Sequence, residues 1–277
     1  NMLLKKLIKN ISPEKKKIEI QGISSNSKKI KRDYIFFAIK GNQINGEKYI
    51  KEAVENGAVV IVCSQNCKYI NKKITVLRTK NVRNFLSEIS SKFYPLKPKN
   101  IIAVTGTNGK TSVADLFYQI LILNNVPVAS IGTLGIKYNK KFIKSSLTSP
   151  DTISLHRELE NIKKHKINNV IIEASSHGLH QNRMNHLKLK AGIFTNFTQD
   201  HLDYHKSMNV YFNSKMLLFK KILPKRKTII CDKTIEKFPI LKKISKKKHL
   251  KMIEIDEIKK KLEQLSFLNL NIFQIKN

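Results

Sequence analysis

The sequence has few of the residues that build disulfide frameworks, zinc sites or membrane spans. Its three cysteines include no Cys-x-x-Cys pair, so we expect reduced, partly buried thiols at Cys63, Cys67 and Cys231. No apolar run approaches the roughly 20 residues that a membrane span needs. Lysines interrupt the apolar residues of the opening stretch NMLLKKLIKN, which is therefore unlike a signal peptide. We expect a globular protein of the cytoplasm, without a membrane partner.

Acidic residues and arginines are also scarce. The 277 residues include 20 acidic and 53 basic side chains, and six arginines leave 47 lysines among the basic ones. Arginine provides the planar fork that matches guanine edges, and the aromatic residues do not alternate with the basic ones as they do on a single-strand stacking surface. We interpret the excess of lysine as solvated surface and expect no nucleic-acid partner. A basic nucleic-acid-binding protein is the alternative from a different class.

Strand and helix patterns alternate along the chain, and a polar segment around Pro95 and Pro98 divides them. This segment predicts a linker between an N-terminal domain, residues 1–98, and a second domain, residues 99–277. In the second domain, continuous apolar strands alternate with helices, which predicts a parallel sheet covered on both faces and an α/β fold. The expected strands lie at 18–23, 34–39, 58–63, 74–79, 101–105, 126–132, 168–175 and 190–197, and the expected helices at 46–58, 112–125 and 154–166.

A glycine-rich turn follows the first strand of the second domain, in the stretch IIAVTGTNGKTSVADLF (101–117). Backbone N–H groups of such a turn, followed by a helix N-terminus, bind phosphate. The turn is shorter than the standard phosphate-loop pattern, because Val104 stands where that pattern has its first glycine. Lys110 would reach the β- and γ-phosphates of a nucleotide and the Thr111 hydroxyl would bind Mg²⁺. An ordinary glycine turn is the alternative.

A lysine falls inside the apolar stripe of a predicted helix that begins after Ser207 and ends before Pro224. The stripe has spacings of three and four, and Lys215 lies in its middle. A charged ammonium on a core-facing stripe is costly, so such a lysine loses its proton or finds a partner. The alternative is a lysine that extends past the helix edge into solvent. The members of the stripe are Met208, Tyr211, Phe212, Leu218, Phe219 and Ile222.

The stretch VTGTNGKTS resembles the ATP loop of the Mur ligases, the ATP-dependent amide-forming enzymes of peptidoglycan precursor synthesis. The resemblance extends from about residue 20 to about residue 232 and is most specific to the MurE-type branch, which adds the third residue of the stem peptide. Four further stretches carry it: NSKKIKRDYIFFAIKG, SLTSPDT, EASSHGLHQNR and FTNFTQDHLDYH. Another ligase of the superfamily, such as a folylpolyglutamate synthetase or a different Mur enzyme, is the alternative within this fold.

The resemblance implies a small UDP-sugar-binding α/β domain followed by a P-loop parallel-sheet ATPase domain. Mur ligases have a third, C-terminal domain, and MurE enzymes carry an Asp-Asn-Pro-Arg motif there. We find no such motif, so we expect a truncated chain in which the C-terminal domain is absent. Binding of the UDP-substrate and nucleotide without catalysis, and activity of the chain by itself, are the alternatives that the sequence leaves open.

Several roles follow from the resemblance alone. It implies that Lys110, Glu173, His201 and Lys215 are catalytic, with Lys215 carbamylated. Glu173 ends an apolar strand, where a carboxylate beside a phosphate loop can hold Mg²⁺, and His201 follows the next strand. The implied Mg²⁺ ligands are Thr111, Glu173, His201 and Lys215. The implied ATP contacts are Gly106, Thr107, Asn108, Gly109, Lys110, Thr111 and Ser112. The implied substrate contacts are Ser25, Ser27, Asn42, Gln43, Ile44, Thr148, Ser149, Ser175, Gln181 and Arg183.

The implied reaction uses ATP and Mg²⁺. ATP phosphorylates the terminal carboxylate of UDP-MurNAc-L-Ala-D-Glu, and the amine of a diamino acid then attacks the acyl phosphate. We expect meso-diaminopimelate rather than L-lysine as that diamino acid, and a monomer. Lys28 stands where the family has arginine, and it keeps the charge without the guanidinium fork.

Overall fold

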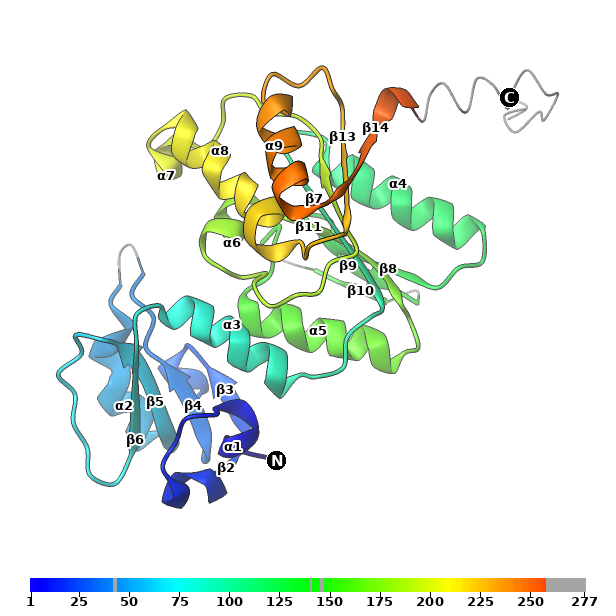
Figure 1. Cartoon of the computed structure of the whole chain (residues 1–277). Coiled ribbons are helices and arrows are strands. Elements are labelled where there is room, and N and C mark those ends of the chain that lie inside the picture. The colour runs from blue at the N-terminus through cyan, green and yellow to red at the C-terminus, as the bar shows by residue number, and fades with distance from the viewer. Residues whose placement is uncertain (42–43, 140, 145–146, 258–277) are drawn as a thin grey trace. The chain divides into compact units, whose positions relative to one another are not determined.

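The computed structural model describes residues 1–41, 44–139, 141–144 and 147–257 (Figure 1). The chain forms two compact units, and it first passes from one to the other between Lys97 and Pro98. Unit 1 comprises Asn1–Lys97, Pro150–His165 and Gln181–Leu187, and unit 2 comprises Pro98–Ser149, Lys166–His180 and Lys188–Asn277. Among the described residues, no helix is both long enough and apolar enough to cross a bilayer.

Unit 1 is built on a four-stranded parallel sheet with the order β3-β4-β5-β6. Beside it, β1 and β2 form an antiparallel pair. The elements are β1 (Met2–Leu3), α1 (Leu4–Leu7), η1 (Pro13–Lys17), β2 (Glu19–Ile20), β3 (Gly22–Ser24), η2 (Ser27–Lys29), β4 (Tyr34–Phe37), η3 (Gly46–Tyr49), α2 (Ile50–Glu55), β5 (Ala58–Ser64), β6 (Thr75–Thr79), α3 (Val82–Phe93) and α5 (Thr152–Lys164). The strands predicted at 34–39, 58–63 and 74–79 and the helix before β5 are confirmed, whereas the strand predicted at 18–23 is divided into β2 and β3, which belong to different sheets.

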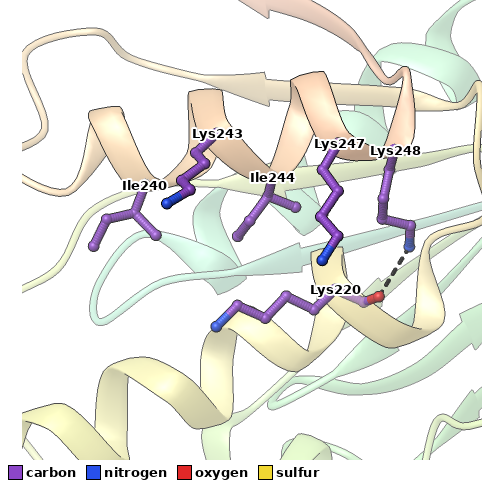
Figure 2. A pocket seen from close by; sticks show the side chains of 6 residues that line it. All are labelled: Lys220, Ile240, Lys243, Ile244, Lys247 and Lys248. Atoms are coloured by element: carbon purple, nitrogen blue, oxygen red, sulfur yellow. Dashed lines mark hydrogen bonds between the residues drawn. The ribbon is translucent and has the colours of Figure 1, made fainter.

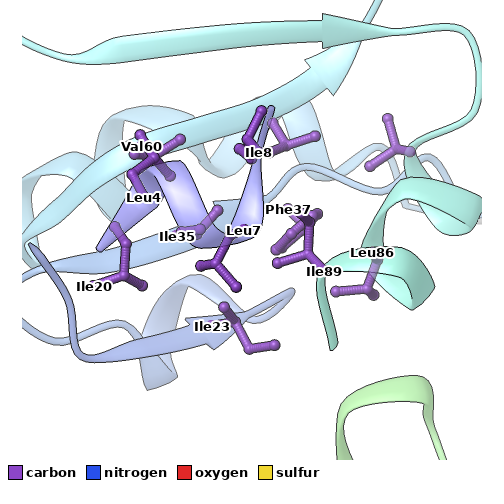
Figure 3. Packing of buried hydrophobic residues seen from close by; sticks show 12 residues of the cluster. Leu4, Leu7, Ile8, Ile20, Ile23, Ile35, Phe37, Val60, Leu86 and Ile89 are labelled. Carbon is purple, nitrogen blue, oxygen red and sulfur yellow. The ribbon is translucent and has the colours of Figure 1, made fainter. Parts of the chain in front are cut away.

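The two faces of this sheet carry separate cores, because side chains alternate along a strand. Ile35 and Phe37 of β4 pack with α1 and α3, and Figure 3 shows their side chains beside Leu7 and Ile89. Phe36, between them, packs in the second core with α2. Full burial of each of these large apolar side chains contributes about 1.5–3 kcal/mol.

The sequence analysis did not predict α3, although Val82, Leu86 and Ile89 recur at helical spacing and are buried. This helix explains why two later segments belong to unit 1. It packs against α5, and the Ser87 hydroxyl donates to the carbonyl of Asn185 at 2.6 Å.

Unit 2 contains a sheet with the strand order β10-β9-β8-β11-β7-β12-β13-β14. The strands β8, β11, β7, β12, β13 and β14, in the order of the sheet, run parallel, which confirms the prediction. At the β8 edge, β9 and β10 add an antiparallel hairpin that the sequence analysis did not predict. The elements are β7 (Asn100–Thr105), α4 (Lys110–Leu123), β8 (Val128–Gly132), β9 (Gly135–Tyr138), β10 (Lys141–Ile143), β11 (Asn169–Glu173), α6 (Ser176–His180), β12 (Ala191–Phe194), α7 (Leu202–His205), α8 (Met208–Leu217), η4 (Leu218–Ile222), β13 (Thr228–Cys231), α9 (Phe238–Lys248) and β14 (Lys251–Glu254).

The order of these strands brings three loops to one edge of the sheet. The connection from β7 through α4 to β8 runs in one direction along the sheet, and the connections from β11 to β12, β13 and β14 run in the other. Because such connections are nearly always right-handed, α4 lies on the opposite face from α8 and α9, as Figure 1 shows. The loops after β7, β11 and β12 therefore meet where the direction changes, the usual place for a ligand in an open parallel sheet.

The predicted helix after Ser207 is confirmed as α8, which continues into one π-helical turn, η4, before Pro224. The Ser207 hydroxyl caps it by accepting a hydrogen bond from the N–H of Val210 at 3.3 Å. Every apolar residue of the predicted stripe from Tyr211 to Ile222 is buried. The three cysteines are buried as well.

Candidate functional site

The glycine-rich turn after β7 has the conformation that a phosphate loop requires. Gly109 has a φ of 80° and is the N-cap of α4, and Gly106 has a φ of 151°. A Cβ at Gly106 would overlap the Thr195 hydroxyl, so only glycine fits there. The first N–H groups of α4 have no intrahelical acceptors and carry the positive end of the helix dipole. The turn therefore has the conformation and the polarity that suit an anion.

The Lys110 side chain folds back over this turn. Its Nζ donates hydrogen bonds to the carbonyl oxygens of Gly106 at 2.9 Å and Thr107 at 2.6 Å. Burial lowers the pKa of Lys110, and the charges of Glu173 and Asp200 oppose that shift. The ammonium thus lies at the turn, next to the N–H groups that would contact phosphate.

The loop after β12 holds the turn in place. The Thr195 hydroxyl donates to the carbonyl of Asn108 at 2.6 Å. The backbone carbonyl of Asn196 accepts from the N–H of Thr107 at 3.0 Å, and its side-chain Oδ1 accepts from the N–H of Asn108 at 2.8 Å. The sequence analysis did not identify Thr195 and Asn196 as site residues. Their position, as polar residues directly after a buried strand, is the signal that could have identified them.

Glu173, at the end of β11, is buried beside the turn with 1 % of its surface exposed. Its Oε2 accepts hydrogen bonds from the hydroxyls of Thr111 at 2.8 Å and Thr133 at 3.1 Å, and its Oε1 accepts from the N–H of Thr133 at 2.8 Å. A Cβ at Gly132 would overlap this carboxylate. The sequence analysis did not identify Thr133 as a site residue.

The donor set around Glu173 fits Mg²⁺ bound together with a nucleotide. Carboxylate and hydroxyl oxygens are ligands that Mg²⁺ accepts, and such sites usually use one or two carboxylates plus substrate phosphates. In the part of the chain that the structure describes, no group of three or more His, Cys, Asp or Glu side chains could hold a metal by itself. Protein side chains alone therefore do not complete a cage here, and phosphate oxygens would supply the remaining ligands.

Lys215 of α8 is buried, with 1 % of its surface exposed, so it does not extend into solvent. Its Nζ donates to the carbonyl of Gly106 at 2.6 Å and lies 4.3 Å from the centre of the Tyr211 ring. The Tyr211 hydroxyl in turn donates to Thr107 Oγ1 at 3.2 Å. Burial, followed by repulsion from Lys110, lowers the pKa of Lys215 to about 7. A large part of this amine is therefore neutral near neutral pH.

His201 is exposed, and its Nε2 lies 3.4 Å from Asp200 Oδ2. Its ring contacts His177 at a centroid distance of 5.0 Å. Within the described residues it makes no hydrogen bond or ion pair to Glu173 or Lys215. The neighbouring His205 is buried, and burial together with the nearby histidines lowers its pKa to about 4.

Two further predicted residues adjoin Glu173. The hydroxyl oxygens of Thr148 and Thr133 lie 3.1 Å apart. Ser149 is buried, and its hydroxyl donates to the backbone carbonyl of Glu173 at 2.8 Å and accepts from the N–H of Ser175 at 3.0 Å. The Ser149 hydroxyl thus holds the end of β11. The Thr148 hydroxyl instead lies next to Thr133, which contacts the Glu173 carboxylate.

The other predicted substrate contacts belong to unit 1. Ser25, Ser27 and Ile44 line a cleft of about 480 Å³, in which the Ser27 hydroxyl donates to Glu52 Oε2 at 2.8 Å. Asn42 and Gln43 lie outside the described residues. Arg183 donates from Nε and Nη2 to Gln181 Oε1 at 3.1 and 2.8 Å.

A second hollow in unit 2, of about 430 Å³, lies between α9 and η4 and contains none of the predicted site residues. Figure 2 shows Lys248 donating to the backbone carbonyl of Lys220, at 3.1 Å. The lining residues are Lys220, Ile240, Lys243, Ile244, Lys247 and Lys248. Since no aromatic or arginine side chain lines it, this hollow lacks the residues that stack on or read bases.

The Mur ligase middle domain family matches residues 104–274, and the Mur ligase family catalytic domain matches residues 19–94. A relative from Brucella melitensis biotype 1 is 38 % identical over 220 residues, which are 79 % of this chain and 45 % of the relative. One from Wigglesworthia glossinidia brevipalpis is 40 % identical over 76 % of this chain and 44 % of its own length. Both are named UDP-N-acetylmuramoyl-L-alanyl-D-glutamate--2,6-diaminopimelate ligase.

Solved structures share the fold. A structure of a ligase with that same name has a TM-score of 0.79 and 24 % identity, and the match covers 91 % of this chain and 52 % of that one. MurF from Acinetobacter baumannii has a TM-score of 0.57 and 17 % identity, with 85 % and 48 % covered. The chain therefore spans about half the length of the relatives it matches.

Proposed function

This chain belongs to the Mur ligase family, and on that premise we propose that it carries the ATP- and UDP-sugar-binding parts of a MurE-type ligase. The reaction joins meso-diaminopimelate to UDP-MurNAc-L-Ala-D-Glu. The observation that carries the proposal is the arrangement of the phosphate loop, in which the Thr111 hydroxyl donates to Glu173 at 2.8 Å beside the Lys110 ammonium. The names of the relatives support the choice of substrates.

The loop residues would bind the triphosphate. The N–H groups from Gly109 to Ser112, at the start of α4, and the positive end of that helix attract phosphate oxygens. Lys110, now hydrogen-bonded to Gly106 and Thr107, would exchange those carbonyls for the phosphates. A charge-assisted hydrogen bond to phosphate is stronger than one to a neutral carbonyl, which favours this exchange.

Thr111 and Glu173 would hold one Mg²⁺, and His201 and a carbamylated Lys215 would help to hold a second. Bound Mg²⁺ supplies neutralisation of the charge on the transferring phosphoryl group and the carboxylate. The buried Lys215 amine is suited to carbamylation because its pKa is lowered to about 7. The ammonium first gives one proton to solvent. The lone pair of the neutral nitrogen then attacks the carbon of CO₂, an N–C bond forms while one C=O π bond becomes C–O⁻, and a second proton leaves the nitrogen, so that a cation becomes an anion with the release of two protons.

The protein contributes positioning and charge to the reaction, and no covalent enzyme nucleophile is needed. A carboxylate oxygen of the dipeptide attacks the γ-phosphorus and ADP leaves. The neutral amine then attacks the acyl carbon, phosphate leaves, and one proton passes from the nitrogen to phosphate or solvent. Thr148, Ser175, Gln181 and Arg183 would orient the muramoyl peptide. The unit 1 cleft of Ser25, Ser27 and Ile44, together with Asn42 and Gln43, would take the UDP end.

We place this activity in the cytoplasm and expect a monomer that needs neither a membrane nor nucleic acid. Thermal unfolding of the chain with UDP-MurNAc-L-Ala-D-Glu, dihydrofolate or a DNA oligonucleotide tests the assignment. Only the UDP-sugar peptide should raise the Tm, and the rise should shrink in Arg183→Lys. A rise with dihydrofolate would indicate a folylpolyglutamate-type ligase, and a rise with DNA alone would indicate a nucleic-acid-binding protein.

A further inference from the structure

Thr133 lies at the turn between β8 and β9, directly after Gly132, and faces Glu173 with two donors. Its N–H donates to Oε1 at 2.8 Å and its hydroxyl lies 3.1 Å from Oε2. Gly132 leaves room for the carboxylate, because any Cβ there would overlap it. The same turn thus provides both the space for the carboxylate and the groups that orient it.

The hydroxyl of Thr133 has one hydrogen and can give it to only one acceptor. Glu173 Oε2 and Thr148 Oγ1 both lie 3.1 Å from it. A carboxylate is the stronger acceptor, so Glu173 takes this hydrogen in preference to Thr148. The N–H and the hydroxyl of Thr133 therefore both donate to the carboxylate.

We propose that Thr133 is a positioning residue that holds the Glu173 carboxylate in the orientation needed to bind Mg²⁺ beside the phosphate loop. The inference rests on the proposed function, in which Glu173 binds that ion. Thr111 also donates to Oε2, at 2.8 Å, but Thr111 is itself a proposed Mg²⁺ ligand. When its oxygen turns to the metal, the backbone and hydroxyl of Thr133 remain to orient the carboxylate. Groups that orient a ligating carboxylate typically affect metal affinity about 10–100-fold.

The test measures binding of the ATP analogue AMP-PNP to the chain by calorimetry, first in EDTA and then over a series of Mg²⁺ concentrations. In Thr133→Val, which keeps the shape and the N–H, we expect unchanged affinity in EDTA and a half-saturating Mg²⁺ concentration raised about tenfold. Thr133→Ser keeps a hydroxyl at this position and should have the half-saturating Mg²⁺ concentration of the wild type. Thr105→Val is the matched control, because the buried Thr105 hydroxyl has no hydrogen-bond partner among the described residues.

The outcomes separate this inference from the proposed function. If the wild type does not bind AMP-PNP, or if Glu173→Gln keeps the full Mg²⁺ dependence, the proposed function fails. If Glu173→Gln loses that dependence while Thr133→Val keeps it, only the role of Thr133 is wrong. Thr133→Val could instead lower the AMP-PNP affinity in EDTA as much as it does in Mg²⁺, or Thr133→Ser could fail to restore the Mg²⁺ dependence. Either result would mean that Thr133 only supports the fold of the turn.

Discussion

Lys110 and Lys215 donate hydrogen bonds to the same backbone oxygen, that of Gly106, at 2.9 and 2.6 Å. Two ammonium groups that share one acceptor repel each other, and the charge of Lys110 adds to burial in lowering the pKa of Lys215. Lys110 is the partner with access to the phosphate site, and Lys215 is the one enclosed by the core. This difference in surroundings supports the proposal that Lys110 acts as a charged phosphate ligand and that Lys215 reacts as a neutral amine.

Lys110→Ala should weaken AMP-PNP binding about tenfold or more, because a hydrogen bond from a charged group contributes about 1.5–3 kcal/mol. Calorimetry on the purified chain measures this change. Lys221→Ala, which removes an exposed lysine of η4, is the control and should bind as the wild type does. Equal affinity in Lys110→Ala and the wild type would exclude Lys110 as a phosphate ligand.

Lys215 should form a carbamate in bicarbonate buffer above pH 7, where the neutral amine predominates because its pKa is lowered to about 7. Carbon-13 NMR with labelled bicarbonate detects it as a carbamate resonance, which Lys215→Met should remove. Lys97, whose pKa burial lowers to about 8, provides the matched control. A resonance that survives in Lys215→Met and disappears in Lys97→Met would show that Lys97, and not Lys215, forms the carbamate.

Gly132→Ala should displace the Glu173 carboxylate, because the new Cβ would overlap it. We expect a loss of stability of about 1–3 kcal/mol from overpacking and the loss of Mg²⁺-dependent AMP-PNP binding. Gly192→Ala separates these effects, since its Cβ would come within 2.9 Å of the Phe219 ring, away from the carboxylate. Gly192→Ala should lower the urea concentration at the midpoint of unfolding and keep the Mg²⁺-dependent binding of AMP-PNP. The same Mg²⁺ response in Gly132→Ala and Gly192→Ala would contradict the prediction.

His156 should make unit 1 sensitive to acid. Burial, together with the charges of Lys97 and His186, lowers the pKa of His156 from 6.5 to about 3. The unfolded chain therefore binds the proton first, and stability should fall as the pH drops below about 6.5, by roughly 1 kcal/mol per pH unit. Urea unfolding at pH 7 and pH 5 should show a smaller pH effect in His156→Leu. The exposed His165, replaced by leucine, is the control and should leave the effect unchanged.

Arg183→Lys should weaken binding of UDP-MurNAc-L-Ala-D-Glu about tenfold, because lysine keeps the charge but loses the fork that matches a carboxylate or phosphate. Calorimetry with the UDP-sugar peptide measures the change. The exposed Arg157 of α5 offers the same substitution on the same unit and should have no effect. A weakening of equal size in both variants would point to general charge attraction instead of a specific contact.

Much of this site could be predicted because its signals are local. The glycines at 106 and 109 follow a strand and precede a helix, so a few consecutive residues define the turn. The position of Lys215 follows from helical spacing alone, since a residue in the middle of an apolar stripe must face the core. The burial of Lys215 confirms that prediction.

Other features depend on which strands become neighbours, and no local pattern contains that information. Thr133 reaches Glu173 because β8 lies beside β11, and Asn196 reaches Asn108 because β12 lies beside β7. The helix α3 was missed, and the segments around α5 and Asn185 join unit 1 through contacts with it. The amino-acid sequence by itself determined the glycine-rich turn, the buried lysine and the α/β pattern, because each of these signals lies in residues that are close together in the sequence. Only the tertiary structure decided which hydroxyls and carbonyls surround them, because hydrogen bonds between distant residues form only after the order of the strands in the sheet is set.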